Sequence, residues 1–173
     1  MAGNGSGSQV YAYGAIDSEP GFGATYASTK AWADAFDSAT VSFYVDYGSA
    51  DGCPERIYSN GPCNHGWTQA EEEYVSWHGA AFPMPEVYTT AVWHPLNHPT
   101  WVTDAMALQW EMIALYGKTI NDSMAFLGPI TEHASDSSTN TPTQGYNDLW
   151  YALNDDSRVA QSPLYETDIQ HGY

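Results

Sequence analysis

Apolar, β-prone runs alternate with amphipathic segments along this chain, and no other feature restricts its fold as much. The β-prone runs span residues 10–16, 40–47, 86–90, 124–130 and 164–169. Between them, residues 25–36, 68–78, 100–116 and 144–154 have the apolar spacing of helices. Each helix can return the chain to begin a new strand in the same direction. The sequence therefore predicts an α/β fold of alternating βα units with a mainly parallel sheet.

The length of the chain fits a single domain. It has 173 residues, with no internal repeat and no shift of composition that would mark a domain boundary. Residues 1–9 (MAGNGSGSQ) are rich in Gly and Ser and lack an apolar run, which predicts a flexible leader or linker and not a signal peptide. We expect residues 10–173 to form one α/β domain.

Acidic residues greatly outnumber basic ones. The chain has 4 Lys and Arg against 21 Asp and Glu, which gives a net charge of −17. So few basic side chains cannot neutralise a phosphate backbone or an anionic membrane surface, and this excludes nucleic acid and membranes as partners. No apolar run reaches the ~18 residues that a bilayer span requires. Low Lys and Arg content fits a secreted protein, although strong acidity also fits a high-salt habitat.

The two cysteines, Cys53 and Cys63, lie ten positions apart in a loop rich in Gly, Pro and Asn (CPERIYSNGPC). Two cysteines that close a short irregular loop favour a disulfide, and a disulfide favours an extracellular location. Two free thiols are the alternative. A metal site has little support, since His65 is the one further ligand nearby.

Carboxylates gather where the predicted strands end, which is where parallel α/β folds bind their ligands. Asp17 and Glu19 follow the first strand, Asp46 lies in the second, and Glu132 follows the fourth. Glu86 opens the third predicted strand, and we therefore expect it at the opposite end of the sheet. Residues two apart on a strand point to the same face, so Asp17 and Glu19 would lie side by side, about 6.5 Å apart along the chain.

The segment IDSEP at residues 16–20 resembles the hydrophobic-D-x-E signature of glycosidase barrels, in particular of lysozyme-type muramidases. It is also similar to the related secreted bacterial glycoside hydrolase-like barrel domains. Further similarity lies in PEVYTT, in the helix around LQW, and in the ending TPTQGYNDLWYALNDD…YETDI. A complete barrel takes about 250 residues, so five strands imply a partial or shortened TIM-barrel-like fold, or an open α/β sheet.

The resemblance implies hydrolysis of a β-linked glycan such as peptidoglycan. Glu19 would be the general acid that protonates the glycosidic oxygen. Asp17 beside it would help the pair to keep a proton, because two close carboxylates resist losing both. Asp46 would position water or stabilise an oxocarbenium ion. No cofactor or metal is implied.

Aromatic side chains near the strand ends would bind the sugar. We expect Tyr44, Tyr47 and Trp93 to stack on sugar rings, whose C–H faces are apolar, and Glu132 to contact the substrate as well.

Other interpretations of these residues remain open. Asp17 can be a turn residue before Pro20-Gly21, with Glu19 in solvent. The chain can also be a non-catalytic extracellular module that binds glycans or the cell surface, or one that self-assembles into a homo-oligomer through an open sheet edge.

Overall fold

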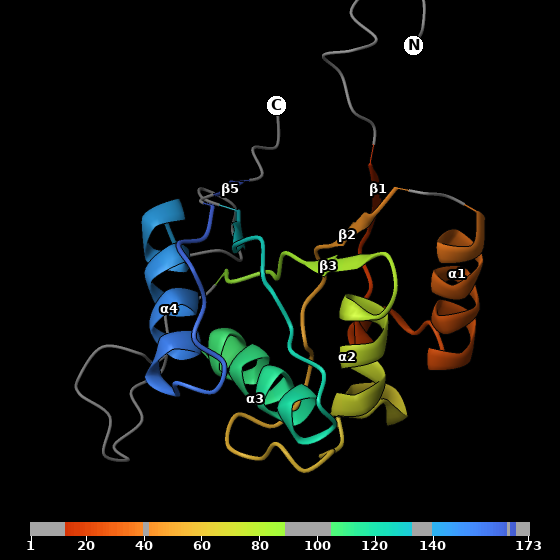
Figure 1. Cartoon of the computed structure of the whole chain (residues 1–173), viewed down its shortest axis with the longest axis horizontal. Coiled ribbons are helices and arrows are strands. Elements are labelled where there is room, and N and C mark those ends of the chain that lie inside the picture. Colours follow the sequence, from red (N-terminus) through yellow and green to blue (C-terminus); the bar gives the residue numbers. More distant parts are fainter. Residues whose placement is uncertain (1–12, 40–41, 89–104, 133–139, 166, 169–173) are drawn as a thin grey trace, which may run out of the picture.

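A computed structural model describes residues 13–39, 42–88, 105–132, 140–165 and 167–168. Helices and strands alternate along these residues, which confirms the predicted α/β class (Figure 1). The strands are β1 (Gly14–Ile16), β2 (Tyr44–Asp46), β3 (Ala81–Pro83), β4 (Ile130–Thr131) and β5 (Thr167–Asp168). The helices are α1 (Tyr26–Ala39), α2 (Gln69–Trp77), α3 (Ala105–Thr119) and α4 (Pro142–Asp155), with single 3-10 turns at Pro20–Phe22 and Asn64–Gly66.

All the strand pairs among the described residues are parallel, as the alternation predicts. In the first sheet β1 pairs with β2 and β2 with β3, and in the second β4 pairs with β5. A parallel bridge between Glu86 and Ile130 links the two sheets. Val87 N donates to Ile130 O at 2.9 Å, and Ile130 N donates to Pro85 O at 2.8 Å. Each strand thus neighbours the next one in the sequence, and the described strands form two small sheets without closing into a barrel.

The third strand begins earlier than predicted. The sequence favours residues 86–90, but β3 is Ala81–Pro83, and of the predicted run only residues 86–88 lie within the described part of the chain. Pro83 and Pro85 have no N–H to give to a neighbouring strand, so regular pairing with β2 ends at Pro83. The run at 124–130 pairs as a strand only at its end, in β4.

Helices that are adjacent in the sequence also pack against each other, α1 on α2, α2 on α3 and α3 on α4 (Figure 1). The largest cluster of buried side chains lies among α2, α3 and α4. Its largest members that are at most 1 % exposed are Trp67, Trp110, Ile113, Leu149 and Leu153. Burial of each such side chain contributes about 1.5–3 kcal/mol. In the described part of the chain no helix has the length and apolar character to cross a membrane.

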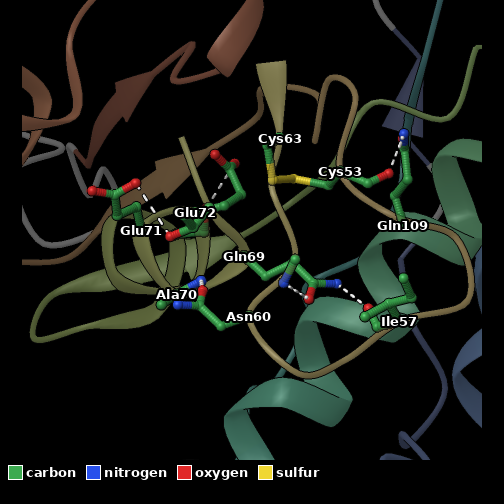
Figure 2. The surroundings of a disulfide bond; sticks show 12 residues. Cys53, Ile57, Asn60, Cys63, Gln69, Ala70, Glu71, Glu72 and Gln109 are labelled. Atoms are coloured by element: carbon green, nitrogen blue, oxygen red, sulfur yellow. Dashed lines mark hydrogen bonds between the residues drawn. A yellow bond between two sulfur atoms is a disulfide. The ribbon is translucent and has the colours of Figure 1, made fainter. Parts of the chain in front are cut away.

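Cys53 and Cys63 form a disulfide, which confirms the predicted pairing (Figure 2). Both cysteines are buried, at 3 % and 9 % exposed. Gln109 of α3 donates from Nε2 to the carbonyl oxygen of Cys53 at 2.9 Å. The closed loop is therefore attached to the helical core as well as to itself.

The side chain of Gln69, fully buried at the start of α2, fills the disulfide loop from within (Figure 2). Its Oε1 accepts a hydrogen bond from Gly61 N at 2.9 Å, and its Nε2 donates to the carbonyl oxygen of Ile57. Asn60 in turn accepts from Ala70 N at 2.9 Å. These contacts give the irregular loop one defined shape at the N-terminal end of α2.

Removing the disulfide should destabilise the fold. A chain with both Cys53→Ala and Cys63→Ala should lose roughly 2–3 kcal/mol of unfolding free energy, because the open loop gains conformational entropy when the chain unfolds. Urea unfolding with and without reductant measures the loss. The chain has only 2 cysteines, so reductant should lower wild-type stability to the same extent and leave the double variant unchanged. Equal stability of wild type with and without reductant would contradict this.

Candidate functional site

Three acids meet beyond the carboxyl ends of β1 and β3. One carboxylate oxygen from each of Asp17, Glu19 and Glu86 lies within 4.8 Å of the other two. Asp17 and Glu19 directly follow β1, and Glu86 follows β3. Parallel strands end at the same edge of a sheet, and this edge is where α/β folds place their ligands. We call these three residues the acid cluster.

Glu86 lies at the opposite end of the sheet from the one expected. The expectation was wrong because it placed the third strand at 86–90, with Glu86 as its first residue. The strand is Ala81–Pro83, and Glu86 therefore comes after it, on the same edge as Asp17 and Glu19. The error concerned the start of a strand, and it reversed the position of a site residue.

Asp46, the last residue of β2, lies beneath the acid cluster. It is 1 % exposed. Its Oδ1 accepts hydrogen bonds from Ser18 N at 3.1 Å and Gly48 N at 3.3 Å, and its Oδ2 accepts from Ser76 Oγ at 2.7 Å. One buried carboxylate thus joins the loop after β1, the loop after β2 and helix α2.

The two loops approach each other so closely that a side chain would not fit between them. A Cβ atom built on Gly48 would lie 2.2 Å from the carbonyl oxygen of Ser18. Glycine at this position lets both backbones reach Asp46 at once. The next residue, Ser49, is thereby brought to Glu19.

Glu19 is bound by Ser49 through two hydrogen bonds. Its Oε2 accepts from Ser49 N at 3.0 Å and from Ser49 Oγ at 2.6 Å, and the side chain is 9 % exposed. Both contacts come from donors, so Ser49 holds the Glu19 carboxyl group in place as a hydrogen-bond acceptor.

The other two acids of the cluster are in surroundings that favour the protonated form. Burial, followed by the negative charge of Glu19, raises the pKa of Asp17 to about 6. Burial raises the pKa of Glu86 to about 8; the hydrogen bond from Tyr88 opposes the shift, and Glu19 and Asp17 add to it. The Tyr88 hydroxyl donates to Glu86 Oε1 at 2.8 Å. One oxygen of Asp17 is buried and has no hydrogen-bond partner among the described residues.

Basic side chains contribute little to the charge environment of the acid cluster, because most of them bind other residues. Lys30 pairs with Asp34 at 2.6 Å on α1, and Arg158 pairs with Asp156 at 2.5 Å after α4. Lys118 donates to Ser123 Oγ at 2.6 Å. The charged groups that act on Asp17 and Glu86 are themselves carboxylates. The site can therefore hold protons, or donate them, at a pH where exposed acids have lost theirs.

The predicted aromatic residues are distributed unevenly. Tyr44 is 1 % exposed, and its ring packs edge-on against Trp32 and Phe36 in the core. Tyr47 is half-buried, and burial together with Asp17 and Glu86 raises its pKa, which places it beside the cluster. Trp93 lies outside the described residues.

Glu132 follows β4 and is partly buried. Its charge adds to the rise in the pKa of Tyr88, so it lies toward the same edge as the acid cluster. Sequence reasoning missed Tyr88 and Ser49. The spacing of Glu86 and Tyr88, two apart on an extended segment, is the signal that would have paired them.

No protein-family model matches the chain, and no curated protein or solved structure is significantly similar to it. The case for a function therefore depends on the geometry of this site.

Loss of the Ser49 hydroxyl should destabilise the fold through Glu19. Ser49→Ala removes the shorter of the two hydrogen bonds to a buried carboxylate, which should cost roughly 1.5–3 kcal/mol of unfolding free energy. Ser38→Ala is the matched control, since its hydroxyl bonds the Asp34 carbonyl oxygen on the exposed side of α1. Urea unfolding compares the two variants. A loss in Ser49→Ala no larger than in Ser38→Ala would show that Glu19 does not depend on this donor.

Proposed function

We propose that the chain is a secreted glycoside hydrolase that cleaves a β-linked glycan at the acid cluster. The observation that carries this proposal is the meeting of Asp17, Glu19 and Glu86, with an oxygen of each within 4.8 Å of the others, at the carboxyl edge of parallel strands. Glycosidases use a pair of carboxyl groups in different protonation states. The different surroundings of Glu19 and Glu86 supply such a pair.

The roles within the pair follow from their hydrogen bonds. Glu19 accepts from Ser49 twice and is suited to act as the carboxylate, whereas Glu86 retains its proton to a pH of about 8. We therefore assign the general acid to Glu86, in place of Glu19 as the sequence alone suggested. Asp17, next to both, helps to keep that proton in the site. Asp46 is too deeply buried to touch a sugar, and we assign it a positioning role.

The spacing of the carboxyl groups favours a retaining reaction. Retaining glycosidases hold the two groups about 5–5.5 Å apart, whereas inverting enzymes leave about 6.5–9.5 Å for a water molecule. In the proposed reaction Glu86 protonates the leaving oxygen as Glu19 attacks the anomeric carbon, which forms a glycosyl ester and breaks the glycosidic bond. Glu86 then takes a proton from water, whose oxygen displaces Glu19 and restores both groups.

Several further features support a glycan substrate. Tyr47 and Tyr88 lie beside the cluster and Glu132 lies toward the same edge, and we assign these three residues to the sugar-binding surface. A net charge of −17 repels strongly anionic polymers, which favours a neutral glycan such as chitin over heavily charged cell wall. The disulfide is compatible with secretion.

The order of the strands supports a partial barrel. β1, β2 and β3 are paired in sequence order, and the bridge at Glu86 and Ile130 continues this order to β4 and β5. In a (β/α)8 barrel each strand also neighbours the next one in the sequence. We therefore propose that these units correspond to part of such a barrel.

Release of reducing ends from insoluble chitin and peptidoglycan tests the function directly. Glu19→Gln and Glu86→Gln should each lower the rate by roughly 100-fold or more, since each removes one half of the pair. Wild-type activity should fall as the pH rises past about 8, because Glu86 then loses its proton. Asp155→Asn, on the exposed side of α4, is the matched control and should keep wild-type activity.

Pelleting with the glycan in the same tubes separates the alternatives. Binding without release, unchanged in both Gln variants, would mean a glycan-binding module. If the protein neither binds nor cleaves these glycans, a glycan partner of either kind is contradicted. A mass above 19.0 kDa on a sizing column would then indicate self-assembly.

A further inference from the structure

A second buried carboxyl group, Glu72 of α2 (Figure 2), has no part in the proposed reaction. It is 0 % exposed. Ser76, one turn further along α2, lies between the two acids: its Oγ is 2.7 Å from Asp46 Oδ2 and 3.4 Å from Glu72 Oε1. The other oxygen of Glu72 is buried without a hydrogen-bond partner among the described residues.

A negative charge on Glu72 would be costly in this position. A buried carboxylate needs a cation or several donors, and Glu72 has one hydroxyl within reach. The charged groups that act on it are all acids: Asp46 of β2, Glu19 of the loop after β1, and Asp51 of the loop after β2. Burial first, and then the charge of Asp46, raise the pKa of Glu72 well above its ordinary value.

The hydrogen bonds decide which of the two acids keeps a proton. Burial raises the pKa of Asp46 to about 7, and the three hydrogen bonds that it accepts, from Ser18 N, Gly48 N and Ser76 Oγ, oppose that rise because they favour its ionised form. Glu72 has no comparable set of donors, so Glu72 is the acid of the two that keeps a proton. The Ser76 hydroxyl has one hydrogen, which it gives to Asp46 at the shorter distance. Its oxygen can then accept a hydrogen bond from a protonated Glu72.

We propose that Glu72 is a positioning residue that acts as a neutral acid: it donates to Ser76, Ser76 donates to Asp46, and Asp46 fixes the two loops that carry the acid cluster. Ser18 lies between Asp17 and Glu19, and Gly48 precedes Ser49, the donor to Glu19. The proton on Glu72 thus keeps the loop after β1 and the loop after β2 in a fixed position relative to each other. The structural part of this inference stands alone, and its effect on catalysis rests on the proposed function.

Glu72→Gln is the discriminating variant, because an amide has the shape of the protonated acid and can donate to Ser76 in the same way. In wild type the unfolded chain loses the Glu72 proton at lower pH than the folded chain does, so this residue lowers stability as the pH rises. The variant lacks this penalty. We expect its Tm relative to wild type to be higher at pH 8 than at pH 5.

Glu71→Gln, at the neighbouring and partly exposed position, is the matched control. An advantage of Glu72→Gln that is equal at the two pH values, or smaller at pH 8, would overturn the inference. This comparison needs no substrate, so it decides the state of Glu72 even if the chain cleaves no glycan.

Rescue of activity tests the positioning role. Glu72→Ala should lower kcat by roughly 10- to 100-fold with little change in KM, because the loops lose their alignment, and Glu72→Gln should restore most of it. If Glu72→Gln is as inactive as Glu19→Gln while wild type cleaves glycan, a charged Glu72 is required and the neutral-acid role is wrong.

Discussion

The shortage of basic side chains governs how this molecule is built. With 4 Lys and Arg for 21 Asp and Glu, buried acids cannot be paired with cations as they are in most proteins. Backbone N–H groups, hydroxyls and bound protons take that place. Asp46 has two N–H donors and the Ser76 hydroxyl, Glu19 has both donors of Ser49, and Glu86 has the hydroxyl of Tyr88. Because the donors to Asp46 and Glu19 come from the loop after β1, the loop after β2 and helix α2, satisfying these two acids also brings the three segments together.

This arrangement links the stability of the fold to the chemistry of the site. Asp46 is inaccessible, yet it holds the backbones that position Asp17, Glu19 and Ser49. The disulfide loop supports the same region from the other side, since the carbonyl oxygen of Asp51 accepts from Asn64 N at 2.9 Å, next to Cys63. In the acid cluster, Glu19 accepts two hydrogen bonds from Ser49, whereas the surroundings of Glu86 favour its protonated form. That contrast arises from burial, hydrogen bonding and the charges of the neighbouring acids.

The sequence predicted those features that depend on local pattern. The alternation of strands and helices, the position of β1 with Asp17 and Glu19 after it, and the disulfide all follow from spacing and composition. Features that depend on long-range packing were not accessible. Pro83 and Pro85 disguised β3, so Glu86 was placed at the wrong end of the sheet. Tyr44 and Tyr47 looked equivalent as aromatic residues near a strand end, but the pleat and the packing of α1 turn Tyr44 into the core. Ser49, Ser76 and Glu72 carry no motif, and only the folded chain shows that they serve buried carboxylates.

The central claim is that the native fold keeps protons on carboxyl groups that lose them in the unfolded chain. Counting protons during unfolding tests it most directly: urea is added at constant pH 7 in lightly buffered solution, and the proton change is titrated. We expect a net release of protons, and a Glu86→Gln chain should release roughly one proton fewer than wild type. Net uptake, or no change in either chain, would mean that these acids are ionised in the native state, and it would contradict the account.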